Sequence, residues 1–95
     1  MLLHLVCFKY KTDVDPSTQR EHRDRLATLR ELDGVVDLKV GADLVRSARS
    51  YDTGLSVTFR DRAALETYAT HPRHVPIAQF GAGLAEHVVS VDFEI

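Results

Sequence analysis

The sequence predicts an α+β domain in which a four-stranded antiparallel sheet carries helices on one face. Apolar residues alternate, or run without a breaker, in four segments, 2–11, 35–44, 51–60 and 87–95, which is typical of strands. Two segments between them, 15–32 and 61–85, space their apolar residues at helical intervals instead. The order β-α-β-β-α-β is the split βαβ arrangement of ferredoxin-like folds.

Asp15 and Pro16 predict the start of the first helix. The Asp15 carboxylate can accept hydrogen bonds from the free amides of a first turn, and proline suits the first helical position. The helix is expected to run to about Leu32, and Gly34 to end it. Its buried stripe is predicted to hold His22, Leu26 and Leu29.

The second helical segment is predicted to be broken in two. Asp61 caps a short helix, and Pro72 stops it because the residue before a proline avoids the helical region. A further helical stretch is expected from about Pro76 to Ala85. The two pieces present these apolar residues on their stripes: Ala64, Leu65 and Tyr68, then Ile77, Phe80 and Leu84.

Period-two alternation sorts the residues of each strand onto faces. One face of each of the first three strands holds these residues: His4, Val6, Phe8 and Tyr10; Val36, Leu38 and Val40; Tyr51, Thr53, Leu55, Val57 and Phe59. The opposite face of the sheet is also apolar in the first and last strands, with Leu3, Leu5, Cys7, Val89, Val91 and Phe93. An apolar patch of this size usually marks an interface, so we expect a homodimer through this face, with Cys7 as a buried structural thiol.

Composition narrows the class of protein. The 95 residues form one domain, 1–95, and the net charge of −2 comes without a basic block, which argues against a nucleic-acid partner. No segment approaches membrane-spanning length, so no membrane partner is expected. A lone cysteine excludes an internal disulfide and fits a reducing cytoplasm.

The stretch YATHPRHVP, residues 68–76, is the first candidate site. It places His71 and His74 three apart around Pro72, with Tyr68 just upstream. Nothing in a small packed core requires that grouping.

Four stretches resemble the stress-responsive A/B barrel (Dabb) family: HLVCFKYK, YDTGLSVTF, LETYATHPRH and VVSVDFEI. The resemblance covers nearly the whole chain, and HP.H followed by a terminal V.VD is its specific part. It implies ferredoxin-like chains that dimerise into an eight-stranded α+β barrel. Ser50 departs from the family pattern, where a glycine often precedes the Tyr-Asp pair, and His22 is unusual on the first helix.

For function, the resemblance implies roles that range from stress-induced proteins of unknown activity to a few polyketide cyclases. In those cyclases a first-strand histidine, and the tyrosine and final histidine of Y..HP.H, act on the substrate. An aspartate of the last strand orients that final histidine. Matched motif to motif, the candidate catalytic residues are His4, Tyr68, His74 and Asp92.

The chemistry of these side chains is coherent without a metal or a cofactor. A carboxylate behind an imidazole fixes its tautomer, so we predict that His74 lies within hydrogen-bond reach of Asp92 and acts as a general base. Asp92 should raise the pKa of His74, while burial should lower it. Tyr68 or His4 could polarise a carbonyl during an aldol-type closure. His71 is expected not to share the contact with Asp92.

The predicted ligand is a small, largely apolar molecule that bears a carbonyl or a phenol. It would occupy a pocket of about 300 Å³ or more between helices and sheet. The candidate substrate-binding residues are Val6, Phe8, His22, His71, Ile77 and Phe80.

Three interpretations stay open: a cofactor-independent cyclase or lyase, a ligand pocket without catalysis, and a non-catalytic stress-response protein whose histidines are structural. His71 is expected to serve the turn before Pro72, and His22 to be a half-buried helix residue. His4, His71 and His74 could offer three nitrogens to zinc, but the proline between two of them gives poor spacing for one metal.

Overall fold

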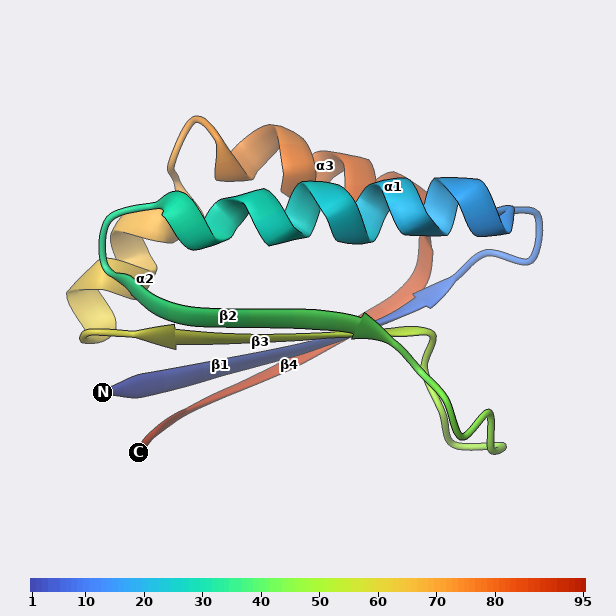
Figure 1. The fold of residues 1–95 in the computed structure, drawn as a ribbon, viewed down its shortest axis with the longest axis horizontal. Coiled ribbons are helices and arrows are strands. Elements are labelled where there is room, and N and C mark those ends of the chain that lie inside the picture. Colours follow the sequence, from blue (N-terminus) through green and yellow to red (C-terminus); the bar gives the residue numbers. More distant parts are fainter.

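One layer of helices lies on one face of an antiparallel sheet in the computed structural model, which describes residues 1–95 (Figure 1). The elements follow in this order: β1 (Leu2–Tyr10), α1 (Pro16–Ala27), a 3-10 turn η1 (Thr28–Glu31), β2 (Val35–Ala42), β3 (Thr53–Phe59), α2 (Arg62–Ala69), α3 (His74–Leu84) and β4 (Ala85–Glu94). The strand order in the sheet is β2-β3-β1-β4, so the predicted ferredoxin-like fold is confirmed. No helix combines the length and the apolar character that a membrane crossing requires.

The antiparallel pairing of β1 with its two neighbours decides which residues face one another. His4 lies opposite Val57 of β3 and opposite Asp92 of β4. The next residue, Leu5, lies opposite Val91. Because side chains alternate along a strand, His4 and Asp92 share one face of the sheet, and Leu5 and Val91 share the other.

The hydrophobic core lies between the sheet and the helices. Leu29, Val57 and Phe59 have no exposed surface. The buried cluster contains Leu2, Val6, Phe8, Leu26, Leu29, Leu32, Leu38, Leu55, Val57, Phe59, Ala64 and Tyr68. Burying each larger side chain contributes roughly 1.5–3 kcal/mol, so this layer holds the helices on the sheet.

α1 begins as predicted but ends earlier. Thr18 donates its backbone N–H to Asp15 at 2.8 Å, and Pro16 takes the first helical position. The α-helix stops at Ala27, and η1 replaces the helix that was expected to continue to about Leu32. The tighter 3-10 turn uses carbonyls that an α-helix end leaves free, and both Leu29 and Leu32 remain buried across it.

β2 does not group Val36 with Leu38 and Val40 as predicted. The pairing with β3 shifts register between Val35 and Asp37, which accommodates one extra residue on β2. Val36 is 56% exposed, whereas Leu38 is 5% exposed. A bulge of this kind breaks the period-two alternation on which the prediction rested.

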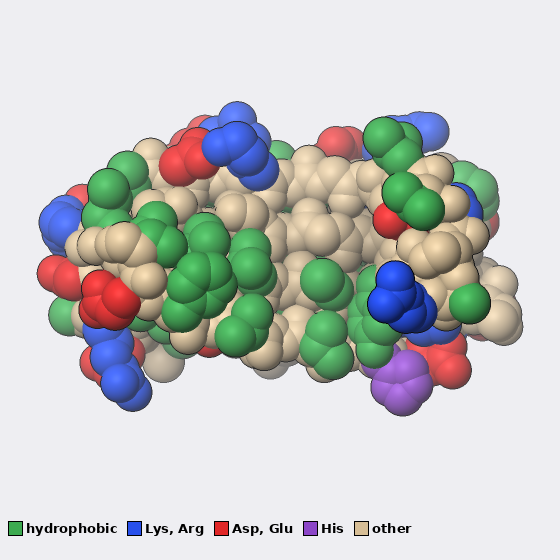
Figure 2. Space-filling view, turned by 90° about the horizontal axis from the view of Figure 1, so that it is seen from below, with side chains coloured by type: hydrophobic (Ala, Val, Ile, Leu, Met, Phe, Trp, Pro, Cys, Tyr) green, Lys and Arg blue, Asp and Glu red, His purple; other side chains and the backbone are tan.

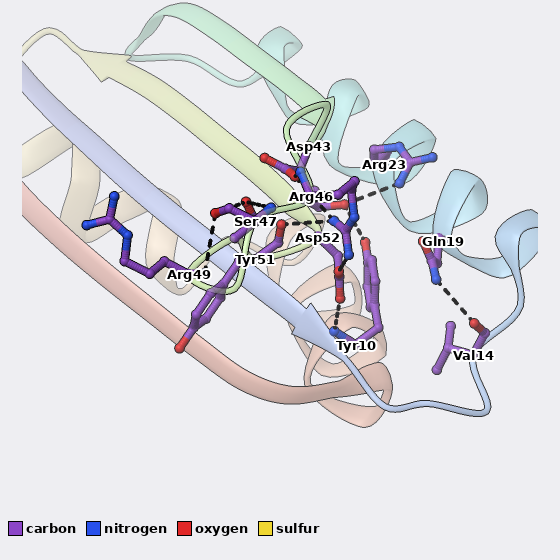
Figure 3. A network of polar contacts seen from close by, with 12 residues as sticks. Tyr10, Val14, Gln19, Arg23, Asp43, Arg46, Ser47, Arg49, Tyr51 and Asp52 are labelled. Atoms are coloured by element: carbon purple, nitrogen blue, oxygen red, sulfur yellow. Dashed lines mark hydrogen bonds and ion pairs between the residues drawn. The ribbon is translucent and has the colours of Figure 1, made fainter.

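The loop between β2 and β3 is held by a polar network around one arginine (Figure 3). Arg46 donates to the Asp52 carboxylate at 2.7 Å and to the Tyr51 carbonyl at 3.2 Å. Asp52 also accepts the backbone N–H of Tyr10 at 2.8 Å, which ties the loop to the end of β1. Side-chain bonds therefore take over where the two strands were predicted to continue.

The break between α2 and α3 falls close to its predicted position. Asp61 accepts the Ala64 N–H at 2.8 Å and caps α2, which ends at Ala69. α3 starts at His74, two residues before the expected Pro76. The earlier start is possible because the His71 carbonyl accepts the N–H groups of both His74 and Val75.

The second face of the sheet carries no helix, and apolar side chains gather on it (Figure 2). Val89, Val91 and Phe93 of β4 are 49%, 55% and 45% exposed. Leu3 and Leu5 of β1 are half-buried beside them. Cys7 lies on the same face and is exposed in the single chain, where a buried thiol was expected. Its predicted burial depends on a partner covering this face.

Gly34→Ala is expected to lower the free energy of unfolding by about 2–4 kcal/mol. Gly34 has a φ of 89°, and a Cβ there would lie 2.7 Å from the Cβ of Ala64. An L-residue in this region costs about 1–2 kcal/mol before the clash is counted. Urea denaturation at one protein concentration measures the change.

The matched control is Gly83→Ala in α3, where a Cβ meets nothing within 4 Å. Alanine is favoured over glycine in a helix by about 1 kcal/mol, so this variant should be as stable as the original chain or more so. Equal destabilisation by both substitutions would contradict the assignment.

Candidate functional site

A cavity of about 340 Å³ lies between the sheet and the helices. Its walls are mostly apolar, and they come from β1, α1, β3, α2, α3 and β4. The lining residues are His4, Val6, Phe8, His22, Leu26, Leu55, Tyr68, His74, Ile77, Ala78, Ala82, Val88 and Ser90. Ala78, Ala82, Val88 and Ser90 are also exposed, so the cavity opens to solvent between α3 and β4.

Asp92 binds His4 and not His74, so the predicted His74–Asp92 contact is wrong. The two residues are direct partners across β1 and β4, and the Asp92 carboxylate accepts from Nδ1 of His4. The imidazole is mostly buried, with a side-chain exposure of 17%. Because the carboxylate occupies Nδ1, Nε2 is the His4 nitrogen left for a ligand.

His74 instead takes its partner from the end of α2. Its Nδ1 lies 3.1 Å from the Ala69 carbonyl oxygen. A carbonyl oxygen can only accept, so Nδ1 carries the proton of the neutral ring and Nε2 keeps a lone pair. Burial lowers the pKa of His74, although the Ala69 carbonyl acts in the opposite direction and nearby His4 and His71 lower it further. The expected carboxylate-driven rise in pKa is absent because no carboxylate contacts the ring.

Tyr68 lies between the two histidines. Its ring centroid is 4.3 Å from that of His74 and 6.3 Å from that of His4. The residue is 3% exposed, and burial raises the pKa of its phenol to about 12. At neutral pH the hydroxyl is therefore protonated and can donate a hydrogen bond. Tyr68, His74 and His4 form one polar group at a largely apolar cavity.

His22 is fully buried, where a half-buried residue was expected. Its Nδ1 lies 2.7 Å from the Tyr10 hydroxyl, which donates to Thr53 at 2.9 Å. His22 therefore donates to Tyr10 from Nδ1. Nε2 has no hydrogen-bond partner and lies beneath Gly81, where a Cβ would come within 2.5 Å of it.

The pKa of His22 is lowered to about 4, mainly by burial and further by the nearby Arg23 cation. The ring is therefore neutral at neutral pH and forms part of the cavity wall with Phe8, whose centroid is 4.7 Å away.

Two of the predicted substrate-binding residues do not line the cavity. His71 accepts the Arg73 N–H on its own Nδ1 at 3.0 Å, which serves the turn between α2 and α3. The Arg25 guanidinium lies over the Phe80 ring, and its central carbon is 4.2 Å from the centroid of that ring. The His71 contact is local to the turn, whereas the Phe80 contact joins α3 to α1, and helical spacing alone reveals neither. No group of three or more His, Cys, Asp or Glu is placed to hold a metal ion.

Several lining residues were not predicted. Ala78 and Ala82 are small and gave no chemical signal in the sequence. Val88 and Ser90 share the face of β4 that carries Asp92, so the alternation along this strand could have identified them.

His22 is expected to make the protein less stable as the pH falls. Between its folded pKa of about 4 and its ordinary value of 6.5, the unfolded chain binds a proton that the folded protein excludes. The free energy of unfolding therefore has its full value, as far as His22 is concerned, above about pH 6.5. It falls by about 3 kcal/mol between about pH 6.5 and pH 4, and His22 causes no further change below that. Urea denaturation from pH 4 to pH 7.5 measures it.

His22→Leu should lose this part of the pH dependence, since the carboxylates titrate alike in both proteins. The exposed His87 is the control, and His87→Leu should keep the full slope. The same slope in His22→Leu as in the original chain would refute the role of His22.

Comparisons with solved structures agree with the fold. A dimeric ferredoxin-like protein of unknown function from Thermobifida fusca has a TM-score of 0.91 at 22% identity, covering 99% of this chain and 90% of that one. A second dimeric ferredoxin-like protein of unknown function, from Jannaschia sp. CCS1, has a TM-score of 0.83 at 28% identity, covering 99% of this chain and 98% of that one. A hydroxynitrile lyase from Passiflora edulis has a TM-score of 0.89 at 18% identity, covering 99% and 92%.

No curated protein matches the chain. The family profile described as the stress responsive A/B barrel domain, Dabb, matches residues 2–95. The matched residues include every strand and helix, and they contain the HP.H and V.VD motifs on which the resemblance rested. The chain belongs to the stress-responsive A/B barrel (Dabb) family.

Proposed function

We propose that this protein is a homodimer in which each subunit binds a small, largely apolar molecule bearing a carbonyl or a phenol. We further propose that it acts on this molecule as a cofactor-independent lyase or polyketide-cyclase-like enzyme. The observation that carries the proposal is the Ala69 carbonyl on Nδ1 of His74, which leaves Nε2 as a base beside an apolar cavity. The volume of about 340 Å³ falls within the usual range of small-molecule pockets.

In the proposed reaction, Nε2 of His74 removes a proton from a carbon next to the substrate carbonyl. The electron pair of the broken C–H bond moves to the carbonyl oxygen, and Tyr68 donates a hydrogen bond to this developing oxyanion. When the resulting carbanion attacks a second carbonyl, a C–C bond forms and the new alkoxide takes the proton back from His74. A lyase would run the same steps in reverse.

His4 is proposed to bind the substrate, and Asp92 to position His4. The Asp92 carboxylate holds Nδ1, so Nε2 can accept a hydrogen bond from a phenol hydroxyl. The remaining wall, including Val6, Phe8 and Ile77, would contact the apolar body of the ligand. A hydroxynitrile lyase has the same fold, which supports the lyase alternative of this proposal.

The second candidate is a non-catalytic stress-response protein with structural histidines. It is favoured by His22 and His71, whose Nδ1 atoms make internal hydrogen bonds that serve the fold. The two candidates differ at His74, which is a base in the first and only a helix-start residue in the second.

Deuterium exchange into the methyl group of acetophenone, followed by proton NMR in D₂O, tests the base directly. The protein should accelerate exchange, and His74→Ala should reduce the acceleration by about 10²-fold or more, as expected for a lost general base. Asp92→Asn should cause a smaller loss because it acts through His4. His87→Ala is the control and should exchange like the original chain.

Exchange at the buffer rate with the original chain would favour the non-catalytic candidate. In that case 4-propylphenol, titrated calorimetrically, should still bind if the cavity is a ligand pocket. Binding that neither His4→Ala nor His74→Ala weakens would exclude this cavity as the site.

The homodimer is proposed to form through the uncovered face of the sheet. The apolar side chains there are those a partner sheet would cover, and similar structures are described as dimeric. Cys7 is a free cysteine, which fits a reducing compartment, and we propose the cytoplasm as the location.

Light scattering at micromolar concentration should report twice the chain mass. Val91→Asp should give a folded monomer, because the carboxylate would lose its water in the interface. Val75→Asp is the matched control: Val75 is 37% exposed, but it lies on α3 in the helical layer, so this variant should remain dimeric. A monomeric original chain would overturn the proposal.

A further inference from the structure

The three histidines that line the cavity, His4, His22 and His74, are held in the same way. Each uses Nδ1 for a contact within the chain, with a carboxylate, a hydroxyl and a backbone carbonyl in turn. None of them makes a further hydrogen bond through Nε2. His4 and His74 already belong to the proposed site, so His22 is the one whose Nε2 has no role in it.

His22 differs from the other two in its burial. The residue is 0% exposed, and its Nε2 is the one buried side-chain nitrogen or oxygen without a hydrogen-bond partner. Such an atom costs about 1–3 kcal/mol. Tyr10 would keep its hydrogen bond to Thr53 without this histidine. An apolar side chain would therefore avoid the cost and leave the Tyr10–Thr53 bond intact, so the fold alone does not explain a histidine here.

The missing partner of Nε2 has to be a hydrogen-bond donor. Tyr10 gives its own proton to Thr53, so Nδ1 of His22 carries the proton of the neutral ring and donates it to Tyr10. Nε2 then holds a lone pair that can only accept. A hydroxyl group on the ligand meets this requirement, whereas a carbonyl oxygen does not.

Helix α3 covers Nε2 with backbone and not with a side chain. Gly81 lies over the ring, and a Cβ at this position would come within 2.5 Å of Nε2. Gly81 is the single buried residue of α3, and no residue of this helix belongs to the buried core cluster. A small outward shift of α3 would therefore open Nε2 to the cavity without disrupting that core.

His22 lies at the end of the cavity away from the proposed base. Its ring centroid is 4.7 Å from that of Phe8, whereas Tyr68 is next to His4 and His74. His4 and Phe8 are four residues apart on the same face of β1, which is roughly 13 Å along the strand. The cavity thus has a polar group at one end and a single unpaired acceptor at the other.

We propose that His22 is a specificity-determining residue whose Nε2 accepts a hydrogen bond from a hydroxyl group at the far end of the ligand. The ligand class narrows to elongated, largely apolar molecules that carry an oxygen function at each end. α3 shifts outward to admit the hydroxyl. The inference rests on the proposed ligand cavity and does not require that the protein is an enzyme.

A matched pair of phenols tests the proposal by calorimetric titration at pH 7.5. 4-(3-Hydroxypropyl)phenol differs from 4-propylphenol only by the terminal hydroxyl. The original chain should bind the hydroxylated compound at least as tightly as the other. In His22→Leu the hydroxyl would lose its water without gaining an acceptor, so the ratio of the two dissociation constants should shift by about tenfold or more in favour of 4-propylphenol.

His87→Leu is the control, because it replaces an exposed histidine outside the cavity, and it should keep the ratio of the original chain. A second readout needs no variant and stays valid if His22→Leu folds poorly. The ¹⁵N resonance of Nε2 of His22 should move when the hydroxylated compound binds, and should move much less with 4-propylphenol.

Two kinds of result would overturn the inference, and they differ in what else they remove. If both phenols bind but the ratio is the same in His22→Leu, or the Nε2 resonance does not respond to the hydroxyl, the cavity is a ligand site and His22 serves only the fold. If neither phenol binds the original chain, the proposed ligand cavity is lost, and with it this contact.

Discussion

The antiparallel pairing of β1 with β4 is the constraint on which both the candidate site and the uncovered face depend. The register places Asp92 opposite His4 and Val91 opposite Leu5. A shift of one residue would move every side chain of β4 to the opposite face. The carboxylate would then leave the cavity side, and Val89, Val91 and Phe93 would turn towards the helices. One backbone ladder thus decides both which histidine receives a carboxylate and which surface remains apolar.

The cavity exists because the helical layer does not fill the space above β1 and β4. The chain turns between α2 and α3, Tyr68 stays at the end of one helix, and His74 begins the next. The same turn makes the Ala69 carbonyl available to His74, so the helix break supplies both the position and the tautomer of the proposed base. Ala78 and Ala82 keep α3 thin where it passes over the cavity.

Some features of the structure lower its stability, and no contact within the single chain compensates for them. The buried Nε2 of His22 has no partner, and an unsatisfied buried polar atom costs about 1–3 kcal/mol. On the other side of the sheet, three large apolar side chains of β4 stay half exposed. Such features are expected where a ligand or a partner supplies the missing contacts, and they lie on opposite faces of the same sheet.

Local patterns in the sequence determined the order of the elements, the caps at Asp15 and Asp61, the buried stripe of α1 and the break near Pro72, because each depends on neighbouring residues. They also grouped His4 with Val6 and Phe8 on one strand face. The alternation of apolar residues predicted the wrong face for Val36, because the spacing of apolar residues in the sequence does not reveal a bulge. Contacts between distant segments were decided only by the tertiary structure. Strand register pairs Asp92 with His4 and not with His74, and Gly81 of α3 packs over the ring of His22, which is fully buried. Both outcomes depend on how residues far apart in the chain meet, and no spacing within a single segment contains that information.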